Sequence, residues 1–379
     1  MTQEHAAADP PDRLGAWWYG IGDRPSDSDL RTAAGRYQVV VLNAWETAAM
    51  RRLRELNPKV TVLVYKDLSS TRSYPGAVDG GKDAAKLPTG VGYIEAGGRW
   101  FARDTRLRHI EWAPDFPQHW QMAVWNRGYQ QQWVHNVVKE VVAEGWDGVL
   151  ADNDFYSLRW YSPAVIAGTV NQDGTDRLLR EGLDRLTAVA GKALADAGKQ
   201  FVPNISEPHL QTGRLAQHAR FTGAMDENFM MRNNDGLLSF QGSTFDELRA
   251  AALAGKQLLL MTRATDDVDR RIRVGYAGAA LLGGDRTYLA VSTTDDYSVP
   301  GWSSYQNLRL GKPTSALAGS GQRVWTRTFT HGWVALNSGS LPVKVIAPPG
   351  LCDVYGRPAP TNQTVPPRDA VVLTTACHG

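Results

Sequence analysis

An α/β architecture, followed by a smaller all-β region, is the fold class that the sequence predicts. The chain has 379 residues, which is enough for one large domain or two. From residue 14 to residue 292, short apolar runs alternate with amphipathic stretches at helical spacing. After about residue 310 the pattern changes to short alternating runs separated by Gly and Pro turns. The two patterns indicate parallel strands covered by helices and then a small antiparallel domain.

The α/β pattern is clearest between residues 130 and 154. Residues 130–144 place apolar side chains at helical spacing, and Gly145 follows as a helix terminator. The buried strand 149–151 then leads directly into the polar run 152–154. In parallel α/β proteins the chemistry lies where the strands end, so this polar run is the first candidate for a functional site.

The other elements repeat this unit along the chain. Strands are expected at residues 14–19, 37–43, 60–65, 201–205, 221–225, 257–262 and 287–292, and helices at 47–56, 176–197, 245–253 and 271–282. Together with the strand at 149–151, these strands predict a (β/α)₈ TIM barrel. A doubly wound sheet is the alternative, but its phosphate fingerprint fails because Pro25 stands at the third position after Gly20 and Gly22.

Three segments are expected in the domain organisation. Residues 1–11 form a disordered N-terminal segment, 12–312 the catalytic barrel, and 313–379 a C-terminal β-sandwich. The last segment holds both cysteines, Cys352 and Cys377, which permit a single bridge. Closing a loop of roughly 25 residues would contribute roughly 3 kcal/mol. A bridge favours a secreted or cell-surface protein, whereas two unpaired thiols and the lack of a signal sequence fit a cytoplasmic one.

Composition excludes several classes of function. A net charge of +2 and a charged fraction of 21% argue against nucleic-acid binding, and no apolar run is long enough for membrane insertion. The chain contains 13 Trp but only 9 Phe, so many indole rings are expected at the surface, where they suit sugar faces. Packing of large loops is the other explanation for these rings. Residues 67–128 are expected to form an irregular insertion, of which 95–128 line a substrate groove.

Carboxylates dominate the candidate catalytic residues. The sequence contains no zinc-hydrolase, serine-esterase or Walker motif, and its eight His are scattered. The predicted strand ends carry Asp67, Asp152, Asp154, Glu207, Asp226 and Glu227. Two carboxylates suffice for glycoside hydrolysis, which requires no cofactor and no metal. Acids at strand ends also bind cations and cap helices, and that alternative stays open.

A resemblance to a known family narrows the function. The run from Gly145 to Asn153 resembles the Asp-Gly-(Val/Ile)-x-x-Asp-Asn strand of the glycosyl-hydrolase-like family 15. It is more distantly similar to the endo-α-1,4-polygalactosaminidases of glycoside hydrolase family 114. Residues 125–129 support this resemblance, and 327–337 resemble the C-terminal β-domain of such barrels. The resemblance implies a TIM-barrel glycosidase with its acids on strands four and six, which are Asp152 and Glu227 here.

We assign Asp152 as nucleophile or general base and Glu227 as general acid. Glu227 is preferred to its neighbour Asp226 because its side chain is longer, and because the period of two in a strand turns only one of them inward. One strand separates the pair, so their backbones should stand roughly 10 Å apart. The carboxyl groups should then be about 5 to 9.5 Å apart, which leaves both retaining and inverting mechanisms open.

Further polar and aromatic residues are expected to bind the substrate. They are Asp67, Trp17, Trp18, Trp125, Asn153, Asn204, Glu207, Asp226 and Arg263. For the polar members, structural hydrogen bonding at a strand end is an equal alternative. The expected partner is a carbohydrate, and the protein is expected to be a monomer. The alternative function is a non-catalytic carbohydrate-binding barrel, and nothing in the sequence identifies the sugar.

Overall fold

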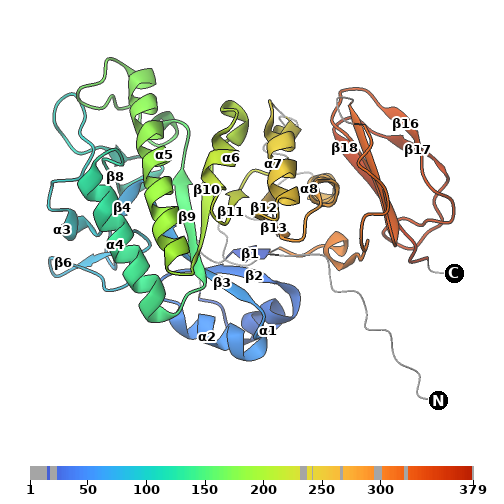
Figure 1. Cartoon of the computed structure of the whole chain (residues 1–379), viewed down its shortest axis with the longest axis horizontal. Helices are drawn as coiled ribbons and strands as arrows, with labels where there is room; N and C mark the ends of the chain where they lie inside the picture. Colours follow the sequence, from blue (N-terminus) through green and yellow to red (C-terminus); the bar gives the residue numbers. More distant parts are fainter. Residues whose placement is uncertain are drawn as a thin grey trace.

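The computed structural model describes residues 15–17, 24–230, 237–240, 242–264, 268–293, 301–319 and 323–377. The N-terminal segment 1–11, which was expected to be disordered, lies outside these residues. The main sheet has eight parallel strands that follow one another in chain order. They are β1 (Gly15–Trp17), β2 (Val39–Leu42), β3 (Thr61–Asp67), β9 (Gly148–Asp154), β10 (Gln200–Ile205), β11 (Gly223–Asp226), β12 (Gln257–Arg263) and β13 (Thr287–Ser292). Because β13 lies against β1, the sheet curls into the predicted barrel (Figure 1).

Helices cover the outside of this barrel. They are α1 (Asp27–Arg36), α2 (Thr47–Leu56), α4 (Arg127–Glu144), α5 (Gln172–Asp196), α6 (Arg214–His218), α7 (Thr244–Leu253) and α8 (Val268–Leu282). The boundaries of α2 match the prediction. Helix α4 begins before the predicted Gln130 because the Asn126 side chain caps the backbone N–H groups of Gly128 and Tyr129. The sequence analysis missed α1 and α6, since α1 buries only two side chains and α6 has only five residues.

Alternating side chains of the strands fill the barrel interior. This inner cluster consists of Val39, Val41, Leu63, Tyr65, Leu150, Val202, Met225, Leu259, Met261 and Ala290. The residues between them, such as Val62 and Val149, pack outward against helices α4 and α5. Asp152, Asn204 and Glu227 each follow an inward residue by two positions, so the period of two brings them to the mouth of the barrel.

The insertion between β3 and α4 is more regular than predicted. It contains an antiparallel sheet of β4 (Ser70–Arg72), β8 (Phe116–Gln121) and β7 (Glu111–Trp112), the hairpin of β5 (Val78–Asp79) and β6 (Lys82–Asp83), and α3 (Tyr93–Ala96). The prediction of an irregular segment is therefore wrong for these residues. Strands this short show too few alternating positions to be recognised from the sequence. The insertion starts at the carboxyl end of β3, and Ser69 Oγ donates to the carbonyl of Asn153 at the end of β9 (2.7 Å).

Short 3₁₀ turns follow several of the strands. They are η1 (Leu158–Trp160) after β9, η2 (Pro208–Leu210) after β10, η3 (Leu238–Phe240) and η4 (Ser304–Asn307). Over the residues that the structure describes, no helix is long and apolar enough to cross a membrane.

The C-terminal region is a small antiparallel sandwich. One sheet contains β14 (Val324–Phe329), β15 (Gly332–Asn337) and β18 (Asp369–Thr374), and the other contains β16 (Val343–Ile346) and β17 (Asn362–Val365). Trp333 and Leu373 pack against Val365 between the two sheets. Cys352 and Cys377 form a disulfide with their Cα atoms 5.4 Å apart. This bridge is the single pairing that the sequence permits.

The sandwich shares a hydrophobic core with the barrel. Helix α8 contributes Ile272 and Leu281 to a cluster that also contains Trp325 and Val372 of the C-terminal sheet. Figure 1 shows the C-terminal strands beside α8. Next to this cluster, the Arg273 guanidinium donates to both carboxylate oxygens of Asp369 (2.9 and 2.7 Å). The sandwich therefore packs against α8 on the outside of the barrel and stabilises it there.

Candidate active site

Two carboxylates meet at the mouth of the barrel. Asp152 lies near the end of β9, Glu227 directly follows β11, and the strand between them, β10, contributes Asn204. The side-chain nitrogen of Asn204 donates to Asp152 Oδ1 (2.8 Å) and to Glu227 Oε2 (2.6 Å). Because both contacts share one nitrogen, these two oxygens lie at most about 5.4 Å apart, the sum of the two distances. The acids are thus at the short end of the range that strand spacing predicted.

Asp152 is surrounded by groups that control its protonation. The Tyr65 hydroxyl donates to Asp152 Oδ2 (2.7 Å), so each carboxylate oxygen accepts one hydrogen bond. Burial raises the pKa of Asp152 to about 7, with further contributions from the charges of Glu227 and Asp67. Two carboxylates this close do not both ionise freely, so the pair retains a proton near neutral pH.

Arg263 completes the row of side chains at the mouth. It ends β12, and its Nη1 lies 3.4 Å from Glu227 Oε1. Both side chains are about a fifth exposed, so both can reach a ligand in the mouth. The consecutive strands β9, β10, β11 and β12 therefore each place one polar group, on or just after the strand, in this row.

Asp67 is buried inside the protein, whereas a substrate-binding residue was expected to be exposed at the mouth of the barrel. It has no exposed surface, and its two oxygens accept five hydrogen bonds. The donors are the backbone of Ser69 and Ser70, the Ser70 hydroxyl, the Arg72 guanidinium and the Asn153 amide. With every lone pair engaged, Asp67 is unavailable to a sugar hydroxyl, and it anchors the start of the insertion beside the acid pair.

Asn153 gives strand β9 a local change of direction. Its φ of 62° lies in the left-handed region, and the register between β9 and β10 shifts at this point. Asp152 can therefore face the mouth while Asp154, two residues later, faces the helices. The Asn153 side chain donates to Asp67 Oδ2 (2.7 Å) and accepts from the Tyr161 hydroxyl (2.9 Å).

Asp154 belongs to a buried ion network outside the barrel mouth. It contacts the Arg214 guanidinium and His218 Nδ1, and His218 Nε2 lies 2.8 Å from Asp184 Oδ1. Burial alone would raise the pKa of Asp154, but the positive charges of Arg214 and His218 lower it. The carboxylate is therefore ionised and fully engaged in joining β9 to α5 and α6.

Asp226 and Glu207 face away from the acid pair. Asp226 precedes Glu227 and points to the other side of the sheet, where burial raises its pKa to about 7. Together with Glu207 and His209 it lines a small pocket that contains neither Asp152 nor Glu227. Glu207 itself adopts a left-handed φ of 51° at the start of η2. The period of two thus selects Glu227 as the inward acid, as expected.

The tryptophans that were expected to stack on sugar rings lie in different parts of the structure. Trp125 is partly buried against the core of the helical layer, with its backbone close to Gly182 of α5. The backbone of Trp17 pairs with Val41 in β2, whereas its side chain and Trp18 lie outside the described residues. Trp112, expected in the groove wall, is only 2% exposed.

Sequence reasoning missed two tyrosines at the site. Tyr65 lies two residues before Asp67, and the alternation from Leu63 onward was the available signal for its inward position. Tyr161 lies in the loop after β9, and its ring stacks on Trp112 with centroids 4.1 Å apart. A loop residue of this kind has no periodic signal. Within the residues that the structure describes, no cluster of three or more His, Cys, Asp or Glu could hold a metal ion.

Comparison with known proteins gives this arrangement a family. The model of the hypothetical glycosyl hydrolase family 15 matches residues 54–333, which include Asp152, Asn204, Glu227 and Arg263. The chain belongs to this family. It is therefore a glycosidase, and its resemblance to the family, seen first in the β9 motif, is confirmed over most of the chain. No curated protein sequence matches the chain.

Solved glycosidase structures resemble this chain to different degrees. The noncanonic maltogenic α-amylase AmyB from Thermotoga neapolitana is 12% identical, with a TM-score of 0.55 over 96% of this chain and 98% of that chain. The glycoside hydrolase domain of PelA from Pseudomonas aeruginosa is 13% identical, with a TM-score of 0.48 over 76% and 97% of the two chains. At these identities the likeness to AmyB shows a common barrel fold.

Substitutions at Asn153 should separate its backbone role from its side-chain role. Asn153→Gly removes two buried hydrogen bonds and should lower the free energy of unfolding by about 1 to 3 kcal/mol. Asn153→Ala should cost about 1 kcal/mol more than Asn153→Gly, because Ala has a Cβ that strains the left-handed conformation. Chemical denaturation of the three proteins measures this order. An Ala variant as stable as the Gly variant would show that the backbone conformation is unimportant.

The protonation of Asp152 should depend on the charge of Glu227. ¹³C NMR of the Asp carboxyl groups should show one that titrates near pH 7, is absent from Asp152→Asn, and moves to lower pH in Glu227→Gln. The shift is downward because the negative charge of Glu227 is one of the causes that raise the pKa of Asp152. Asp226 also has a raised pKa, so Asp226→Asn serves to assign the second resonance. An unshifted Asp152 resonance in Glu227→Gln would contradict the electrostatic link.

Proposed function

We propose that the chain hydrolyses glycosidic bonds of a polysaccharide or oligosaccharide with retention of configuration, using Asp152 as nucleophile and Glu227 as acid and base. One observation carries the proposal: a single Asn204 nitrogen contacts both carboxylates and keeps the bonded oxygens within about 5.4 Å. Retaining glycosidases separate their carboxyl groups by about 5 to 5.5 Å, whereas inverting enzymes leave about 6.5 to 9.5 Å for a water molecule. The short gap favours direct attack by a carboxylate.

The first chemical step forms a covalent intermediate. Glu227, in its acid form, donates a proton to the oxygen of the scissile bond as the bond from that oxygen to the anomeric carbon breaks. The Asp152 carboxylate attacks the same carbon, and the leaving chain departs as an alcohol. In the second step the Glu227 carboxylate takes a proton from water, which attacks the anomeric carbon and releases Asp152. Glu227 is then protonated again and the cycle closes.

The hydrogen bonds around the pair support this division of roles. Asp152 accepts from the Tyr65 hydroxyl and the Asn204 amide at 2.7 and 2.8 Å, and both donors stabilise its ionised form. Glu227 shares the Asn204 amide, while Arg263 stands at the longer distance of 3.4 Å. Burial and the charge of Glu227 raise the pKa of Asp152. In the active form that we propose, Asp152 is ionised and the proton of the pair is on Glu227.

The neighbouring polar groups supply binding and support. Arg263 faces the mouth, where we assign it to sugar hydroxyl groups as well as to Glu227, whereas the buried Asn204 positions the two acids. Asp67 and Asn153 support the site without contacting the substrate, because both are buried and bonded to protein groups. We also propose that the enzyme works outside the cytoplasm, which the Cys352–Cys377 disulfide supports.

Isosteric substitution of the acids tests the proposal. Asp152→Asn and Glu227→Gln should each reduce the release of reducing ends by roughly a thousandfold or more, since each removes a nucleophile or a proton donor at nearly constant volume. The substrates are a panel of plant, fungal and bacterial polysaccharides. Asp226→Asn is the matched control, because it alters an adjacent carboxylate that lines a separate small pocket, and it should retain activity.

The same panel distinguishes the alternatives. Retention of a polysaccharide by wild-type protein without any release of reducing ends would indicate a carbohydrate-binding barrel that has no turnover. Loss of activity in Asp226→Asn together with near-normal activity in Glu227→Gln would transfer the acid role to Asp226.

A further inference from the structure

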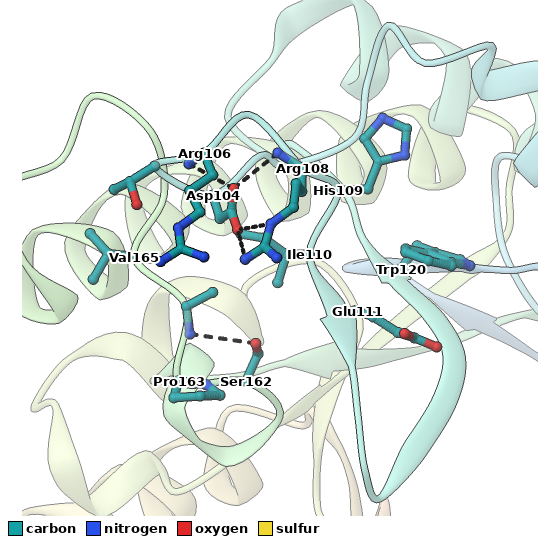
Figure 2. A pocket seen from close by; sticks show the side chains of 12 residues that line it. Asp104, Arg106, Arg108, His109, Ile110, Glu111, Trp120, Ser162, Pro163 and Val165 are labelled. Atoms are coloured by element: carbon teal, nitrogen blue, oxygen red, sulfur yellow. Dashed lines mark hydrogen bonds and ion pairs between the residues drawn. The ribbon is translucent and has the colours of Figure 1, made fainter.

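A second recess lies in the insertion, close to the acid pair but outside it. This groove has a volume of about 810 Å³. One wall is formed by residues 104–106, residues 108–111 and Trp120, and the other by residues 162–165, as Figure 2 shows. Recesses of this size accommodate ligands as large as a short oligosaccharide segment. Neither Asp152 nor Glu227 lines the groove, so catalysis at the acid pair does not explain what the groove does.

Two arginines project from a rigid turn at one end of this groove. Asp104 Oδ1 accepts from the backbone N–H groups of Arg106 (2.8 Å) and Arg108 (2.9 Å), and Asp104 Oδ2 accepts from the Arg108 guanidinium. Leu107 between the arginines adopts a left-handed φ of 63°, and its N–H donates to the Asp104 carbonyl. In Figure 2 the guanidinium groups of Arg106 and Arg108 both point into the groove. The turn therefore fixes the backbone from which both arginine side chains extend, and Asp104 also holds the Arg108 guanidinium.

The charges at the arginine end of the groove favour an anion. Asp104 compensates the guanidinium of Arg108, whereas no hydrogen bond or ion pair joins the guanidinium of Arg106 to another described residue. Glu111 lies farther along the wall, where its Oε1 accepts from the backbone of Gln118. Burial lowers the pKa of His109, with a further contribution from Arg103, so His109 is neutral at pH 7. At the turn, the exposed guanidinium without an ion pair to a described residue is that of Arg106, while the carboxylate of Glu111 lies farther along the groove.

A pair of stacked rings connects the groove to the acid pair. Glu111 and Trp112 form strand β7; Glu111 lines the groove, and Trp112 stacks on Tyr161. Tyr161 directly precedes the second groove wall, and its hydroxyl donates to Asn153, the neighbour of Asp152. The groove and the acid pair thus lie on either side of the Trp112–Tyr161 stack.

We propose that the groove is a remote subsite for an acidic polysaccharide, whose carboxylate or sulfate groups bind Arg106 and Arg108. Guanidinium groups suit both anions because their planar N–H donors match two oxygens at once. The partly buried ring of Trp120 offers an apolar surface farther along the same wall. The proposal deepens the proposed function, on which it rests for the cleavage step but not for binding. The substrate class is then a polyanionic glycan, held away from the bond that is cut.

Binding to an inactive full-length chain tests this subsite. Glu227→Gln should bind polygalacturonate and alginate, which carry carboxylates, or chondroitin sulfate, which also carries sulfate esters, in isothermal titration calorimetry. It should bind neutral dextran and cationic chitosan at least tenfold more weakly. Affinity for the acidic polymers should fall as the salt concentration rises. Comparing the acidic polymers shows which anion the arginines prefer, and binding of either kind supports the proposal.

Three substitutions on the Glu227→Gln background locate the binding. Arg106→Ala should weaken binding of the acidic polymer about tenfold through loss of a charged hydrogen bond. Asp104→Asn should strengthen binding, because it retains an acceptor for the turn and releases Arg108 from its ion pair. Arg185→Ala, an exposed arginine on α5 that does not line the groove, is the matched control and should bind normally.

Two results would overturn the proposal. One is equal affinity for dextran and the acidic polymers, and the other is an Arg106→Ala variant that binds as tightly as Arg185→Ala. The readout is independent of cleavage, so the two proposals fail separately. Binding of acidic polymers by Glu227→Gln, with no polymer of the panel cut by wild-type protein, would refute the glycosidase mechanism alone. Cleavage of a neutral polymer without any binding of acidic ones would refute the subsite alone.

Discussion

The side-chain amide of Asn204 sets the geometry at the mouth of the barrel. It donates to Asp152 and Glu227 at once, from the strand that lies between theirs. Rotating the amide by half a turn would place its oxygen against two carboxylates, so the charges of the acids fix its orientation. Because Asn204 is only 1% exposed, the surrounding packing also limits its movement. The spacing of the acids, on which the mechanism that we propose rests, follows from this one buried donor.

The rest of the site depends on how strand β9 ends. A regular strand would turn Asp152 and Asp154 to the same side, but the left-handed residue Asn153 reverses the direction between them. One acid then serves the mouth, while the other joins Arg214 and His218 among the helices. The polar side chain of Asn tolerates the left-handed conformation better than most residues. The same side chain ties the strand to Asp67 and to the loop that carries Tyr161.

The features that follow from periodicity could be predicted from the sequence. The alternation of strands and helices predicts the barrel, and the period of two within strands separates Glu227 from Asp226. Features created by loops and by changes of direction could not be predicted. By position alone Asp67 and Asp154 could not be distinguished from Asp152, since all three are acids at strand ends, and only the family resemblance favoured Asp152. Only their hydrogen-bond partners, Arg72 and Arg214 among them, reveal that two of these acids are fully engaged within the protein.

The stereochemistry of hydrolysis tests the account most directly. For any polymer that the enzyme cuts, ¹H NMR in the first minutes of reaction identifies the anomer that is released, before mutarotation mixes the two forms. Carboxylates held together by Asn204 leave no room for an attacking water between Asp152 and the sugar, so two displacements should occur and the product should retain the configuration of the cleaved bond. A first product of inverted configuration would contradict the central role of the Asn204 bridge.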